Sequence, residues 1–225
     1  MPEVVEAFDE WLEIVRFHNG QSNTGIEVVA NPGVSGDVIA EAEHELGFSL
    51  APEARDLYQH ANGLSANVFV FPQDLYFYPL EHTLPLVRGS TSWIEGQRLE
   101  AEHDLPGALG PQGVPVKPFN IFSGPGGNMH IESAEPWTGL ISFLNEDGFA
   151  WVSRTLTGFL RANIDAYRSE RLVWSENFQR FIVAPGPHPN LASFQFGDPI
   201  DLNNCGAYYW RWSDWRSETP KDQRR

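Results

Sequence analysis

Hydrophobic residues recur at helical spacing in the segment between residues 35 and 47. Three of them share one face of a predicted helix whose other sides are acidic: Ile39, Ala42 and Leu46. Ser35 or Asp37 can cap the amino end of this helix, and Gly47 can adopt the left-handed conformation that often ends one. The pattern therefore predicts a short helix with both ends marked.

A second segment with the same spacing follows directly. Its apolar stripe is formed by Ala54, Leu57, Tyr58 and Ala61. Pro52 suits the first helical turn, where a missing N–H costs no hydrogen bond, and Asn62-Gly63 is expected to close the helix. The two helices should form an antiparallel or angled pair whose apolar stripes cover a sheet.

Short apolar runs between turn residues predict a series of strands: residues 26–30, 68–71, 75–78, 119–122, 128–132, 139–144, 149–153 and 191–196. The run 68–71 is apolar throughout, so we expect both of its faces to be buried. In the run 75–78, Tyr76 and Tyr78 share one side of the strand, and Leu75 and Phe77 share the other.

Further helices are predicted at residues 3–17, 92–103 and 155–167, and the last can continue or restart up to about residue 183. Residues 80–87 fit either a short helix or an extended segment, and residues 104–118 are a loop rich in glycine and proline. The expected fold is α+β, with a mixed, mostly antiparallel sheet of about six strands and helices packed against it.

The helix pair carries a series of residues that resembles the SUKH superfamily. The series is Ile39, Glu43, Leu46-Gly47-Phe48, Leu50-Ala51-Pro52, Leu57-Tyr58 and Asn62-Gly63, with Ala51 as an insertion and Leu64 where a second glycine is common. The order of strand, polar turn, strand and helix over residues 140–160 resembles the C-terminal part of the same superfamily.

The resemblance covers residues 31–170 and suggests how the chain is organised. An N-terminal helix and loop (1–30) would pack on a SUKH-like domain (31–170), followed by an aromatic-rich C-terminal extension (171–225). The resemblance implies the same α+β architecture and a function in binding. Many bacterial members resemble immunity proteins, which block a polymorphic toxin in the cell that produces it, and fungal relatives look like regulators of cell-wall synthesis.

Charge narrows the choice of partner. The 225 residues include 30 acidic and 15 basic ones, which gives a formal net charge of −15. Such a field repels nucleic acid and anionic membranes and attracts basic proteins, although an acidic surface also serves solubility alone. We therefore expect a basic protein partner, such as a nuclease toxin, and neither a nucleic-acid nor a membrane partner.

The compartment follows from the cysteine count and the start of the chain. A single cysteine, Cys205, excludes an intrachain disulfide, and residues 1–6 lack the basic and apolar regions of a secretory signal. No stretch approaches the roughly 18 apolar residues that span a bilayer. We therefore expect a reduced, cytoplasmic protein.

The sequence lacks the motifs of catalytic, cofactor and metal sites. The segment 123–128 is rich in glycine but has no Lys-Ser/Thr ending for a phosphate. His44 begins a zinc-protease-like motif in which Phe48 stands where the second histidine is required. We expect His60 near a helix end and His130 at a half-exposed strand position. We predict no catalytic residue, no metal ligand and no cofactor.

The acidic charge concentrates between residues 37 and 104, which hold twelve acids and three bases. Aromatic residues surrounded by charge dominate tight protein interfaces. The predicted protein-binding residues combine both kinds: Asp74, Tyr76, Tyr78, Glu81, Trp93, Glu95, Glu100, Glu102 and Asp104. Two alternatives are a regulatory scaffold that binds through the aromatic residues 208–215, and an enzyme whose site is assembled only in space.

Overall fold

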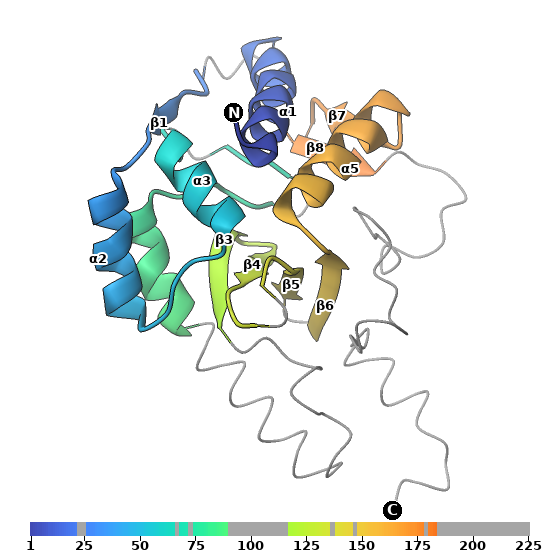
Figure 1. Ribbon diagram of the computed structural model, residues 1–225. Helices are drawn as coiled ribbons and strands as arrows, with labels where there is room; N and C mark the ends of the chain where they lie inside the picture. Colours follow the sequence, from blue (N-terminus) through green and yellow to red (C-terminus); the bar gives the residue numbers. More distant parts are fainter. Residues whose placement is uncertain are drawn as a thin grey trace, which may run out of the picture.

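The computed structural model describes residues 1–21, 26–65, 68–71, 74–89, 117–135, 138–145, 148–177 and 180–183. These residues form helices and antiparallel strands around a shared core, which confirms the α+β class (Figure 1). The helix predicted at 92–103, the strand predicted at 191–196 and the aromatic segment 208–215 lie outside the described residues. Within the described ranges, no helix is both long and apolar enough to cross a membrane.

The helices lie where the apolar periodicity predicts them: α1 (Glu3–Gln21), α2 (Gly36–Leu46), α3 (Pro52–His60) and α5 (Leu156–Arg168). A further helix spans residues 80–89, for which the sequence left helix and extended chain open. The predicted continuation of α5 toward residue 183 is wrong. The helix ends because Glu170 takes a left-handed φ of 57°, after which the Arg171 N–H donates back to the Ala166 carbonyl (2.8 Å).

All the described strand pairs are antiparallel, in agreement with the mostly antiparallel sheet that we expected, but they are divided among three sheets. The four-stranded sheet has the order β3 (Pro118–Gly124), β4 (Gly127–Glu132), β5 (Ile141–Asn145) and β6 (Gly148–Ser153). The two-stranded sheets pair β1 (Ala30–Pro32) with β2 (Ala61–Leu64), and β7 (Leu172–Ser175) with β8 (Arg180–Val183). The strand predicted at 26–30 is thus displaced to β1.

The segment that follows β2 connects the two-stranded sheet of β1 and β2 to the four-stranded sheet. Tyr76 exchanges two backbone hydrogen bonds with Ser123 of β3 (2.9 and 3.1 Å), and Leu64 of β2 donates its N–H to the Phe77 carbonyl (3.0 Å). The pairs Tyr76–Ser123 and Phe71–Leu75 are isolated antiparallel bridges, so the strands predicted at 68–71 and 75–78 form a bend and not a regular ladder. The backbone of this bend is thus hydrogen-bonded to β2 on one side and to β3 on the other.

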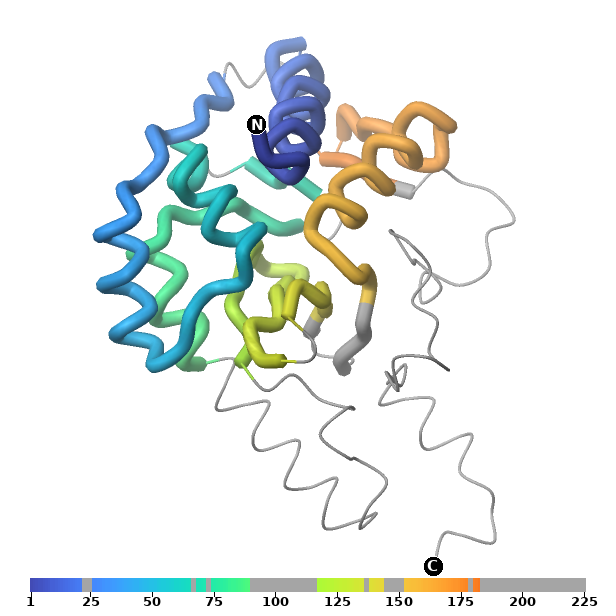
Figure 2. The backbone as a smooth tube through the Cα atoms, viewed as in Figure 1, coloured from blue at the N-terminus to red at the C-terminus, as the bar shows by residue number. Residues whose placement is uncertain are grey.

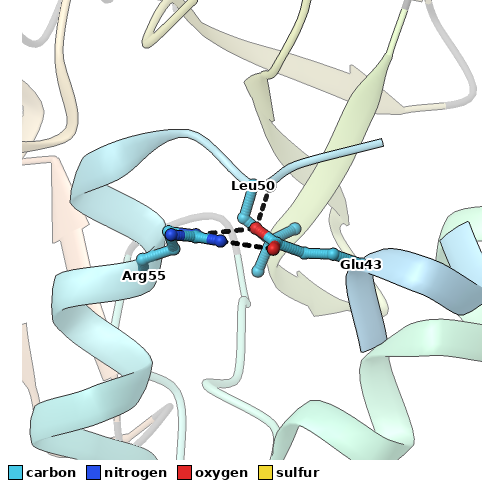
Figure 3. Close-up of polar contacts among 3 residues, drawn as sticks. All are labelled: Glu43, Leu50 and Arg55. Carbon is cyan, nitrogen blue, oxygen red and sulfur yellow. Dashed lines mark hydrogen bonds and ion pairs between the residues drawn. The ribbon is translucent and has the colours of Figure 1, made fainter. Parts of the chain in front are cut away.

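The corner between α2 and α3 is closed by Glu43, a residue of the SUKH-like series. Its carboxylate accepts a hydrogen bond from the Leu50 N–H (2.7 Å) and pairs with the guanidinium of Arg55 (Figure 3). The hydrogen bond from Arg55 is the main cause that lowers the pKa of Glu43, so this carboxylate stays ionised. Its role is therefore to fix the angle between two helices.

The ends of the helix pair agree with the sequence at α2 and differ at α3. Ser35 caps α2 by accepting a hydrogen bond from the Val38 N–H (3.4 Å), and Gly47 ends it at a φ of 75°, as predicted. The prediction that Asn62-Gly63 closes α3 is wrong. The helix ends at His60, because Ala61 already has the extended conformation of β2.

The helices pack around a core that both ends of the described chain share. α1 lies alongside α5 and contacts α3, and α2 lies alongside the helix of residues 80–89 (Figures 1 and 2). His60 at the end of α3 pairs with Asp9 of α1 (2.8 Å). Trp11 of α1 is buried against Phe71 and Phe181, and its indole N–H donates to the Val70 carbonyl (2.7 Å). These contacts hold the bend after β2 in place.

Candidate functional site

Three aromatic rings form a half-buried row on the bend after β2, which we call the aromatic strip: Phe69, Tyr76 and Tyr78. Phe69 stacks on Tyr76 with ring centroids 4.9 Å apart, and Tyr76 lies 5.5 Å from Tyr78 at an interplanar angle of 51°. Leu75 and Phe77, which alternate with the tyrosines, are buried in the core. The predicted division of residues 75–78 into two sides is confirmed, and all three rings keep part of their surface exposed.

Carboxylates lie next to the strip along the chain on both sides. Asp74 takes a left-handed φ of 58° and pairs with Arg180 of β8, so its charge is compensated within the protein. Burial, and after it the charge of Asp74, raises the pKa of Tyr76. Glu81 follows the strip, is exposed and accepts a hydrogen bond from the Asn62 side-chain amide (3.4 Å). Glu81 is therefore the acid that a partner can reach more readily.

Tyr58 is fully buried beneath the aromatic strip and contacts it at Tyr78. The Tyr58 hydroxyl donates to the Tyr78 carbonyl (3.2 Å) and lies 3.1 Å from the Thr83 hydroxyl oxygen. Burial is the main cause that raises the pKa of Tyr58, so the phenol stays protonated and can donate. The Asn62 side-chain oxygen accepts from the Leu80 N–H (2.7 Å), which ties β2 to the helix of residues 80–89. Two residues of the SUKH-like series thus hydrogen-bond to the backbone at and just after Tyr78, the last residue of the strip.

Four of the nine predicted binding residues lie together on this bend and at the start of the following helix: Asp74, Tyr76, Tyr78 and Glu81. The other five lie outside the described residues: Trp93, Glu95, Glu100, Glu102 and Asp104. The sequence reading missed Phe69, because it treated residues 68–71 as buried on both faces. Val68 and Val70 are buried and Phe69 between them is half-buried, but every residue of this run is apolar, so the sequence carried no signal that singled out Phe69.

Polar side chains also lie in register across the four-stranded sheet. Asn120 of β3 pairs with His130 of β4, which pairs with Ser142 of β5, and all three residues are buried. The expected half-exposed position of His130 is therefore wrong, because both faces of β4 are covered. Both ring nitrogens of His130 and the Ser142 hydroxyl have no hydrogen-bond partner. His130 and Ser142 are thus neither coupled to each other nor open to a substrate.

The burial of His130 predicts a specific pH dependence of stability. Desolvation lowers the pKa of His130 from 6.5 to about 3. Between these pH values the imidazole is therefore protonated in the unfolded chain and neutral in the folded one. Stability is therefore retained above the unfolded value and lost as the pH falls from 6.5 toward 3. We expect the free energy of unfolding of the wild type to fall by about 2 kcal/mol more than that of His130→Gln between pH 7 and pH 5.

Denaturant titration at a series of pH values measures this difference. Subtracting the His130→Gln curve removes the contributions of other acid-sensitive groups, such as Glu43, which are present in both proteins. Parallel curves for the two proteins would show that His130 is not buried as a neutral ring.

Charged residues also line a pocket of about 330 Å³ at the amino ends of α1 and α5. Its walls include Glu3, Asp56 and Arg161, and Glu53, which accepts a hydrogen bond from the Leu156 N–H (2.7 Å) at the start of α5. Glu53 thus stabilises the helix end. No group of three or more histidine, cysteine or acidic residues in the described part of the chain could hold a metal ion. We assign no chemistry to this pocket.

We compared the chain with protein-family models and with curated proteins. A scan against protein-family models finds no match to the chain, and a search of curated proteins finds no similar protein. The resemblance to the SUKH superfamily therefore rests on the residues named above, and the function must be argued from the site itself.

Proposed function

We propose that this chain is a non-enzymatic protein-binding module of the SUKH type, an immunity protein that binds and neutralises a cognate toxin in the cytoplasm. The aromatic strip is the observation that carries the proposal. Aromatic side chains that are half-exposed on a rigid backbone are typical anchors of protein interfaces, because they bury a large area at little cost in side-chain entropy. Tyr58 and Asn62 supply that rigidity.

The charge of the chain supports a basic partner. The formal net charge is −15, and the exposed carboxylate of Glu81 follows the strip. A negative surface raises the rate at which a basic protein associates, and a nuclease that grips nucleic-acid phosphates has a basic groove of this kind. An inhibitor needs only to cover such a groove, so no catalytic group is required of this chain.

Co-expression with a toxin tests the proposal. An immunity protein is expected to be encoded next to a large secreted toxin, so the toxic domain of such a neighbour is expressed in a bacterial host with and without the chain. We expect the wild type to restore growth and the Tyr76→Ala/Tyr78→Ala double variant to lose most of the protection, because the aromatic anchors contribute most of the binding energy.

Phe17→Ala is a matched control for this experiment. Phe17 lies on α1 and is 56% exposed, so its substitution removes an aromatic surface residue without touching the strip. Full protection by Phe17→Ala and by the double variant alike would place the recognition surface elsewhere. Failure of the wild type to protect against the neighbouring toxin would refute the immunity function.

A further inference from the structure

We infer that the aromatic strip recognises an arginine side chain of its partner, whose guanidinium stacks on Tyr78 and pairs with the carboxylate of Glu81. This inference rests on the proposed function and names the chemistry by which the same site reads its partner. Three observations support it: the orientation of the rings in the strip, the ion pairing of the two acids that flank the strip, and the position of Glu81 in the chain.

The orientation of the rings leaves Tyr78 as the receptor. Phe69 and Tyr76 are nearly parallel, with an interplanar angle of 23°, so each covers one face of the other. Tyr78 is tilted by 51° from Tyr76, so these two rings do not stack face to face. Because Tyr78 is only half-buried, part of its ring can accept a planar cation, which the electrons of an aromatic face attract.

Of the two acids that flank the strip, Glu81 is the one available to pair with a partner's arginine. Asp74 already pairs with Arg180, which comes from β8 within the same chain. Glu81 forms no salt bridge with a described residue, and its hydrogen bond from Asn62 engages a single carboxylate oxygen, Oε2. An arginine can donate two N–H groups to one carboxylate, and the exposed Glu81 has room for this arrangement.

The position of Glu81 in the chain suits an ion pair beside the ring. Glu81 is three residues from Tyr78, at the start of the helix of residues 80–89. Asn62 holds the start of this helix, since its amide donates to the Glu81 carboxylate and its oxygen accepts from the Leu80 N–H. A guanidinium combines stacking and paired hydrogen bonds in one plane, whereas the ammonium of lysine is a strongly hydrated point charge. The strip should therefore prefer arginine to lysine at equal net charge.

Two short peptides test this preference, one in which glycine alternates with arginine and one in which it alternates with lysine. Both are blocked at their ends and titrated into the full chain at low salt, with binding followed by NMR chemical shifts. We expect the arginine peptide to bind the wild type about fivefold more tightly or better. Tyr78→Ala should bring the ratio of the two affinities close to one, and Glu81→Gln should weaken the arginine peptide.

Glu41→Gln is the control for the loss of a charge, because Glu41 is an exposed acid of α2 that is not part of the strip. This variant should keep the preference for arginine. Equal affinities of the two peptides for the wild type, a preference that survives Tyr78→Ala, or no binding of the arginine peptide at millimolar concentration would each overturn the inference. The growth assay needs no peptide, so protection without a preference for arginine would leave the proposed function standing and refute only this inference.

Discussion

Replacement of Tyr58 with alanine should lower the free energy of unfolding by about 3–5 kcal/mol. The side chain is fully buried, and its ring lies 5.3 Å from Phe77 and 5.8 Å from Phe119 of β3. The substitution removes these contacts and leaves a cavity between α3 and the sheet, which the surrounding backbone can fill only in part. Such a loss is a large share of the stability of an ordinary domain, and chemical denaturation measures it directly.

Tyr58→Phe separates the ring from its hydroxyl. It keeps the aromatic contacts and loses only the hydrogen bonds near Tyr78 and Thr83, so we expect a cost of about 1–2 kcal/mol. Equal losses for the alanine and phenylalanine variants would mean that the ring contacts contribute little. That result would contradict the burial of Tyr58 and its role beneath the strip.

Gly63→Ala should destabilise the protein by about 2–6 kcal/mol, because two separate effects act at this position. Gly63 has a φ of 75°, a conformation that costs a residue with a Cβ atom. An added Cβ would also lie 2.4 Å from the Pro79 nitrogen and 2.6 Å from the Tyr78 carbonyl carbon. These are backbone atoms that cannot rotate away, so the strip would be pushed off β2. Thermal and denaturant unfolding give the size of the loss.

Gly47→Ala provides the matched comparison. Gly47 has the same φ of 75°, but a Cβ placed there meets nothing within 4 Å. Only the conformational cost remains, so we expect about 1 kcal/mol. If the two alanine variants lose the same stability, the close approach of β2 to the bend is not as tight as described.

The helices could be predicted from the sequence because their information is local. The apolar spacing around Ile39 and Leu57, the cap at Ser35 and the left-handed residue Gly47 each act within one or two helical turns. The end of α3 could not be predicted in the same way. Asn62-Gly63 has the composition of a helix stop, but the pairing of β2 with the distant β1 draws these residues into a strand.

The sheets were harder to predict because their pairing depends on contacts between distant residues. The residues around Tyr76 do not indicate that it pairs with Ser123, or that the two form an isolated bridge. The burial of His130 has the same origin, since alternation gives the side of a strand but not what covers it.

The candidate site could be predicted in part. The alternation of tyrosines with buried residues placed Tyr76 and Tyr78 on one side, which the structure confirms. The sequence could not show that Arg180 compensates Asp74, because these residues meet only in the folded chain. Phe69 was missed for another reason, since a wholly apolar run carries no contrast between its two sides.

The most direct test of the central claim is the dissociation constant of the complex with the neighbouring toxin, measured by calorimetry for the wild type and for Tyr76→Ala/Tyr78→Ala. We predict that the double variant, shown to be folded by its circular dichroism, binds about 100-fold more weakly or worse, because two aromatic anchors are lost. An affinity of the double variant equal to that of the wild type would contradict the assignment of the aromatic strip as the surface that recognises the partner.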